Sequence, residues 1–224
     1  MKKVFLLVAA GLITTAGFSQ VRFGAQAAGT FSSASLSEDT EGMKKKMKPG
    51  FGVGVIAEIP LSDALSLRPS LNFMQKGVKL EGSETSDMGS FSGEMKVNMN
   101  YVELPVIFAY NFNLPNSKIY VGAGPSFGAG ISGKSKSHFT VTMPGMPPFS
   151  ETEEVETFKK DEDGGADFKR FDFSANVIAG IQLNNGFFVN AGGLFGLSNL
   201  SRDSGSRYRN IGGQLTIGYL LNRK

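Results

Sequence analysis

The chain has 224 residues, with 23 Lys and Arg against 20 Asp and Glu, and no Cys. A net charge of +3 over that length is too small to indicate a nucleic-acid binder, so we expect no nucleic-acid partner. The absence of Cys excludes the small disulfide-stapled class of exported domains, whereas 29 Gly and 19 Phe without Trp are typical of a β protein.

The first predicted element is a signal peptide over residues 1–19. Met1-Lys2-Lys3 supplies a charged start, and residues 4–13 form a short apolar run. Gly17 and Ser19 are the small residues that cleavage before Gln20 requires, which leaves residues 20–224 as a single domain. No later apolar run reaches the ~18 residues of a membrane-spanning helix. The pattern therefore argues against a helical membrane protein.

Eight strands are predicted in the remaining chain, because apolar residues there alternate with small or polar ones. Their approximate spans are 21–32, 50–60, 65–80, 94–112, 118–134, 168–183, 186–200 and 207–221. In the fifth span Ile119 and Val121 fall on one face, whereas the other face carries mostly Gly and Ser. One apolar face and one small or polar face are what a transmembrane β-barrel strand requires.

The connections between these strands alternate in length. The short ones are 61–64, 113–117 and 184–185, and the long ones are 33–49, 81–93, 135–167 and 201–206. Outer-membrane barrels have this asymmetry, with short periplasmic turns, long external loops and, for an even strand number, both termini in the periplasm. The sequence therefore predicts an all-β fold, an eight-stranded antiparallel up-and-down transmembrane β-barrel in the bacterial outer membrane, which we expect to be a monomer.

Charged residues fall on the predicted lumen face in equal numbers of each sign. They are Arg22, Arg68 and Arg170, with Glu58, Glu103 and Asp172. Eight strands leave a lumen just wide enough for side chains, and charges there are tolerated only when they are paired. We expect these residues to pair across a packed polar lumen, and an ion or proton path stays open as the alternative.

Two adjacent strands carry motifs that resemble a known family. The first reads Asn100-Tyr101-Val102-Glu103-Leu104-Pro105, and the second Tyr120-Val121-Gly122-Ala123-Gly124-Pro125. They resemble the Y-x-E-x-P and G-x-G-P strands of the PorT-like, or porin-family, outer-membrane β-barrel proteins of Bacteroidetes-type bacteria. The resemblance covers nearly the whole chain and implies a barrel like that of OmpX or OmpA. Members include secretion-linked barrels, so it implies no single task.

Residues that could support catalysis or metal binding are few. His138, the only histidine, lies near Ser135, Ser137 and the acidic run 151–156, so a general base in an outer-membrane protease or lipid A-modifying enzyme is an alternative. Asp161, Asp163 and Asp167 could supply oxygen ligands for Ca²⁺, although their spacing is not that of a calcium loop. We expect a solvated imidazole, no metal and no cofactor.

Two further segments are candidates for surface contacts. Lys44, Lys45, Lys46 and Lys48 could bind lipopolysaccharide phosphates, or form a solvated run. Met143, Met146 and Phe149, in the longest predicted loop, could recognise a partner. The expected function is that of a structural or surface-binding barrel acting through external loops. The alternatives are an enzyme using His138, a small-solute channel and an accessory barrel of a secretion system. Expected partners are outer-membrane lipid and lipopolysaccharide, the assembly machinery and an extracellular protein.

Overall fold

The computed structural model describes residues 21–36, 43–87, 89–159, 168–203 and 205–221, so the predicted signal peptide lies outside the described residues. Strands account for most of this part of the chain. They are β1 (Arg22–Leu36), β2 (Met43–Pro60), β3 (Leu65–Ser86), β4 (Gly89–Asn113), β5 (Ser117–Thr142), β6 (Phe149–Glu156), β7 (Phe171–Leu183), β8 (Phe187–Gly196) and β9 (Tyr208–Leu220).

Eight of these strands close into a ring. Neighbours pair antiparallel in the order β1, β2, β3, β4, β5, β7, β8, β9, and β9 pairs with β1 to close it. The predicted up-and-down barrel of eight antiparallel strands is therefore confirmed. β6 lies outside the ring and pairs with β5 alone among the described strands.

The short predicted connections form tight turns at one end of the barrel, which we call the turn end. At Asn185-Gly186, the Gly186 amide donates to the Leu183 carbonyl at 3.0 Å. The φ of Gly186 is 99°, a conformation that only glycine adopts without strain. The turn between β4 and β5 closes similarly, with the Leu114 amide donating to the Ser117 carbonyl at 2.9 Å.

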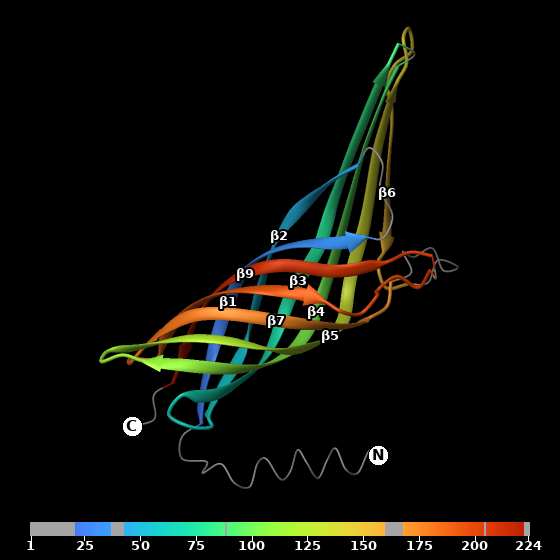
Figure 1. The fold of residues 1–224 in the computed structure, drawn as a ribbon. Coiled ribbons are helices and arrows are strands. Elements are labelled where there is room, and N and C mark those ends of the chain that lie inside the picture. The colour runs from blue at the N-terminus through green and yellow to red at the C-terminus, as the bar shows by residue number, and fades with distance from the viewer. Residues whose placement is uncertain (1–20, 37–42, 88, 160–167, 204, 222–224) are drawn as a thin grey trace, which may run out of the picture.

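The long predicted connections are the main difference from the sequence-based expectation. Much of 33–49, 81–93 and 135–167 is strand: β3 and β4 stay paired as far as Ser86 and Gly89, and β5 continues to Thr142. We call this sheet, made of residues 43–47, 78–86, 89–98, 134–142 and β6, the arm; it stands beyond the ring (Figure 1). The strand ends predicted from the sequence lie where apolar alternation stops, but backbone pairing continues wherever a polar strand finds a partner.

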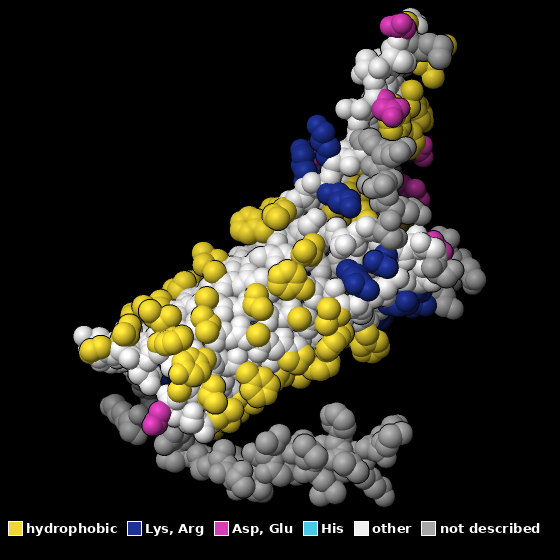
Figure 2. Space-filling model, viewed as in Figure 1, with side chains coloured by type: hydrophobic (Ala, Val, Ile, Leu, Met, Phe, Trp, Pro, Cys, Tyr) yellow, Lys and Arg dark blue, Asp and Glu magenta, His cyan; other side chains and the backbone are white. Residues whose placement is uncertain are grey.

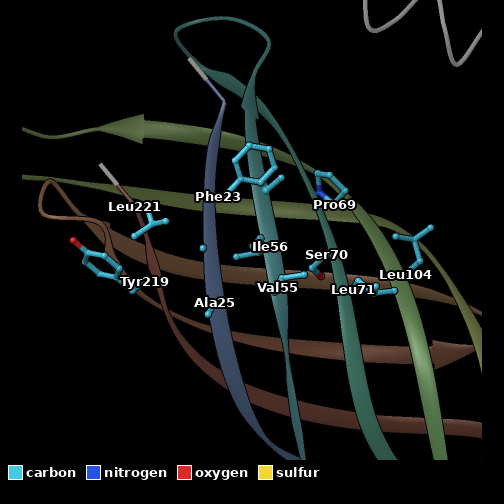
Figure 3. A pocket seen from close by; sticks show the side chains of 12 residues that line it. Phe23, Ala25, Val55, Ile56, Pro69, Ser70, Leu71, Leu104, Tyr219 and Leu221 are labelled. Atoms are coloured by element: carbon cyan, nitrogen blue, oxygen red, sulfur yellow. The ribbon is translucent and has the colours of Figure 1, made fainter. Parts of the chain in front are cut away.

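The barrel wall has the predicted faces. Leu65 and Leu71 are exposed on its outside, whereas Ser66 and Arg68 are buried in the lumen. Hydrophobic side chains spread over the outside of the barrel in Figure 2. Near the turn end, Phe23, Val55, Leu71, Tyr219 and other apolar residues surround a hollow of about 620 Å³ above Ala25 (Figure 3). An acyl chain suits such an apolar hollow, so we regard it as part of the lipid-facing surface.

Candidate functional site

The turn-end half of the lumen is organised around one carboxylate. Glu58 is fully buried and forms salt bridges with Arg22, Lys118 and Arg68, the last at 3.7 Å. The Arg68 guanidinium also lies 4.1 Å from the centre of the Tyr120 ring and 5.1 Å from that of Phe188. We call these four charged residues the Glu58 cluster, in which three cations share one anion.

The half of the lumen nearer the arm is organised around one cation. Lys76 forms salt bridges with Glu103 and, at 3.1 Å, with Asp172. Asn210 and Ser198 donate hydrogen bonds to the Asp172 carboxylate at 2.9 and 3.1 Å. We call Lys76, Glu103 and Asp172 the Lys76 cluster. Its two carboxylates share one ammonium group, the reverse of the Glu58 cluster.

The two clusters contain five of the six charged residues that were predicted to pair in the lumen. They also contain Lys76 and Lys118, which are not among those six. Lys118 and Lys76 both lie on lumen-facing positions of their strands, and Lys76 continues the alternation of Ser66 to Asn72. The expectation for Arg170 was wrong in part. It precedes β7, is exposed, donates to the Gly130 carbonyl at 3.0 Å and forms no salt bridge with the described residues.

The space between the clusters is small. A polar cavity of about 40 Å³, bordered by Arg68, Asn72, Glu103 and Asn176 among others, would hold roughly three water molecules. A second cavity of about 20 Å³ lies beside Lys76 and Asn210, and both are small, as expected for the narrow lumen of an eight-stranded ring.

An apolar cap closes the lumen at the arm end. Its buried members are Ala34, Val78, Leu80, Val97, Met99, Tyr101, Phe158, Leu200 and Tyr208. Phe158 packs edge-on against Tyr101, and a Cβ on Gly130 would lie only 2.3 Å from the Phe158 ring. Residues 135–167, predicted only as a long external loop, therefore contribute to the core, because Phe158 belongs to the cap.

The outer face of the arm continues the lipid-facing side of the barrel and is charged. Cross-strand pairing aligns Lys46 with Lys79, Lys79 with Lys96, and Lys96 with Lys136. We call these four residues the lysine row. Glu81 bridges Lys46 and Lys79, and Glu94 bridges Lys79 and Lys96. Lys136 lies opposite Glu154 on β6, which forms a salt bridge with Lys134 on the same face, and Lys44 lies opposite Glu81. Lysines still outnumber glutamates on this face, so it keeps an excess of positive charge.

Hydrogen bonds hold these arm residues in their charged forms. The pKa of the Glu94 carboxyl is lowered to about 2. The largest cause is its hydrogen bond from Lys79, and the second is its hydrogen bond from Lys96. Bonds from Lys46 and Lys79 lower the pKa of Glu81, and bonds to Glu81 and Glu94 raise the pKa of Lys79. Both signs of charge are therefore present throughout the neutral and mildly acidic range.

The remaining predicted candidates are separated by the fold. Lys45 pairs with Leu80, on the opposite side of the arm from Lys44 and Lys46, and Lys48 is half-buried, with its carbonyl accepting from Ser32 at 3.4 Å. His138 lies exposed on the outer face, where its ring contacts the hydroxyls of Thr152 at 2.8 Å and Thr140 at 3.5 Å. Asp161, Asp163 and Asp167 lie outside the described residues.

The inner face of the arm is apolar at its tip. Phe91, Phe139 and Phe149 lie there, with the Phe139 and Phe149 rings 6.1 Å apart between centres. Phe149 is 59% exposed, and in the turn beyond β5 Met146 is 66% exposed. Glu151 and Glu153 share this face, because they pair with Phe139 and Ser137. We call Phe91, Phe139, Met143, Met146 and Phe149 the tip patch.

Two features are absent from the described residues. They contain no helix that is long and apolar enough to span a membrane. Within the same ranges, no three His, Cys, Asp or Glu side chains lie close enough together to hold a metal ion.

Comparisons with known proteins identify the type of barrel. A family model described as an outer membrane protein beta-barrel domain matches residues 14–202. Similar solved structures include Ail, the attachment invasion locus protein of Yersinia pestis, with 14% identity over 90% of this chain and 99% of that one and a TM-score of 0.40. Neisserial surface protein A has 14% identity over 90% and 97%, with a TM-score of 0.41. OprG from Pseudomonas aeruginosa has 12% identity over 91% and 95%, with a TM-score of 0.45. No curated protein gave a significant match.

Proposed function

The chain belongs to the family of outer-membrane β-barrel proteins, and from this premise we propose that it binds a partner protein at the cell surface through the tip of its arm. The arm then stands outside the cell, and both termini lie in the periplasm. The tight turns at the opposite end support this orientation, because periplasmic turns of such barrels are short. A narrower relation to the PorT-like branch is part of the proposal, supported by the motifs around Glu103 and Gly124.

The tip patch is the observation that carries this function. Its side chains lie on a sheet well beyond the ring, yet Phe91, Met143, Met146 and Phe149 remain at least two-fifths exposed. A contiguous exposed apolar surface outside the membrane is costly to maintain and is typical of a protein interface. Glu151 and Glu153 border the patch, so the complementary partner surface is apolar with basic side chains around it.

The filled lumen favours binding over transport. The Glu58 cluster, the Lys76 cluster and the apolar cap follow one another along the interior from the turn end to the arm end, and the cavity between the clusters has room for only a few waters. We expect purified protein in a planar bilayer to show no steady porin-like conductance. Large, stable current steps would favour the channel alternative.

The orientation can be tested directly, because the chain has no Cys of its own. A single Ser90→Cys substitution, at the start of β4 near the arm tip, should react with a membrane-impermeant maleimide in intact cells. Asp63→Cys, in the turn between β2 and β3, is the matched control and should react only after the outer membrane is permeabilised. The reverse labelling pattern would place the arm in the periplasm and overturn the proposed orientation.

Partner binding is tested by photo-crosslinking in living cells. A photoreactive phenylalanine analogue at position 149 should give a discrete protein adduct, and the same group at Thr140, on the outer face, should not. Phe91→Ser together with Met146→Ser should abolish that adduct. The barrel should remain folded, which is seen as heat-modifiable mobility, a change of mobility on an SDS gel after heating. An unchanged adduct in this variant would show that the tip patch does not bind the partner.

A further inference from the structure

The lysine row is an arrangement that folding alone does not favour. Like charges directly opposite one another on neighbouring strands destabilise a sheet, and here four lysines occupy one line across β2, β3, β4 and β5. Glu81 and Glu94 offset only part of this charge, because each carboxylate is shared by two lysines of the row. Lys44 and Lys134 lie beside the row on the same face, and Glu154 and Glu156 lie opposite its β5 end on β6, with Glu154 facing Lys136. Six lysines against four glutamates leave an excess of two positive charges.

The position of the row specifies what can reach it. On β3 the last apolar residue of the outer wall is Phe73, and Lys79 follows six residues later on the same face. At ~3.3 Å per residue and a strand tilt near 40°, Lys79 stands roughly 15 Å above the apolar zone. The polar interface of a phospholipid leaflet is only about 5–8 Å thick on each side. The row therefore lies above the lipid headgroups, beside whatever extends outward from the outer leaflet.

The outer face is also shaped for a ligand with several anionic groups. Lys44, Lys46, Glu94 and His138 border a shallow groove that runs across β2 to β5. Basic side chains gather where the arm leaves the barrel in Figure 2. Lysine binds phosphate as a compact point charge, and a line of ammonium groups spaced one strand apart matches several phosphates better than one.

From the register, the surplus charge and the height above the lipid, we propose that the lysine row binds the phosphorylated saccharide of the outer-leaflet glycolipid. The outer face of the arm is thereby bound to the saccharide layer above the lipid headgroups, while the tip patch stays free. This site goes beyond partner binding at the tip and rests on the proposed outward orientation of the arm.

The test compares a neutral-row variant with a charge-matched control. The neutral-row variant carries Lys46→Gln, Lys79→Gln, Lys96→Gln, Lys136→Gln, Glu81→Gln and Glu94→Gln, which removes four positive and two negative charges. The control carries Lys45→Gln and Lys159→Gln, which changes the net charge by the same two units away from the row. Replacing the four lysines by Arg instead retains the charge. Heat-modifiable mobility of each variant verifies that the barrel has folded.

The probe is fully deacylated lipopolysaccharide, which keeps its phosphates but cannot bind through acyl chains. It is titrated against protein in phosphatidylcholine nanodiscs, next to a dephosphorylated sample and inorganic polyphosphate. We expect the neutral-row variant to bind the phosphorylated saccharide on the order of 30-fold more weakly than wild type, since it loses two net positive charges. The control and the Arg variant should bind like wild type, and dephosphorylation should weaken wild-type binding.

Equal binding by wild type and the neutral-row variant would overturn the site. If the protein bound polyphosphate but not the phosphorylated saccharide, the ligand of the lysine row would not be the outer-leaflet glycolipid. A wrong orientation of the arm can be distinguished from a wrong binding site. It would change the labelling of Ser90→Cys in cells but leave binding in nanodiscs unchanged.

Discussion

The lumen and the outer face of the arm both contain networks of lysine with glutamate, but the network on the arm is far more exposed to water. The Lys76 and Glu103 side chains are each 4% exposed, whereas that of Lys46 in the arm is 53% exposed. A buried ion pair strongly destabilises the protein when one partner is removed, because the other charge stays desolvated. An exposed pair contributes little, since water and salt screen it. The same residue types therefore contribute to stability in the lumen, and on the arm they are available for the recognition that we propose.

The largest expected effect comes from removing the central residue of either lumen cluster. Glu58→Gln leaves three cations without their shared carboxylate, and Lys76→Met leaves two carboxylates without their ammonium group. Each should lower the free energy of unfolding by about 3–5 kcal/mol in urea titrations of lipid-reconstituted protein. The triple variant Lys76→Met, Glu103→Gln, Asp172→Asn should recover part of this loss. A triple variant less stable than Lys76→Met alone would contradict the clustering.

A comparable effect is expected at the apolar cap, where lumen and arm meet. Phe158→Ala should cost about 3 kcal/mol, because it leaves a cavity against Tyr101 and Gly130. Phe149→Ala, at the exposed tip, is the control and should change the unfolding midpoint little. Shortening the segment between Thr142 and Phe149 should preserve the heat-modifiable barrel. A deletion that also removes Phe158 should destabilise it, and equal stability of the two deletions would count against the cap.

A smaller effect is expected when an outer member of a cluster is changed. Glu103→Gln leaves Lys76 paired with Asp172, so no charge in the Lys76 cluster loses its only partner. We expect a loss of about 1–2 kcal/mol, below that of Lys76→Met measured in the same titration. A loss equal to that of Lys76→Met would mean that Asp172 does not share the ammonium charge.

The smallest effect is expected on the arm and depends on pH. The pKa of Glu94 is lowered to about 2 by its lysine bonds, so its contribution is fully present above the unfolded value near 4.3. That contribution is lost only as the pH falls from about 4.3 towards 2. NMR titration of the Glu94 carboxyl should show no change between pH 7 and 5. In the double variant Lys79→Gln, Lys96→Gln, the pKa should return towards its ordinary value, and an unchanged pKa would show that these lysines do not cause the shift.

The sequence was sufficient for the ring but not for the arm. Alternation in runs such as Leu65 to Phe73 has a period of two, so it identified both the strands and their lumen side. Strand ends were missed because polar residues such as Lys79 and Glu94 pair through the backbone as readily as apolar ones. Phe158 was missed because its contacts with Gly130 and Tyr101 join segments that have no shared local pattern.

The residues of the candidate sites illustrate the same division. The sequence by itself determined a closed barrel, a lumen lined with charges of both signs and an apolar segment around Phe149, because each follows from composition or from nearest-neighbour alternation. Only the tertiary structure decided that Lys46, Lys79, Lys96 and Lys136 stand in one row, and that Lys45 faces away from it. That alignment depends on cross-strand register, including the shifts between Met47 and Gly52 and between Asn100 and Tyr101. Register is set by pairing between residues far apart in the chain, so no local pattern contains it.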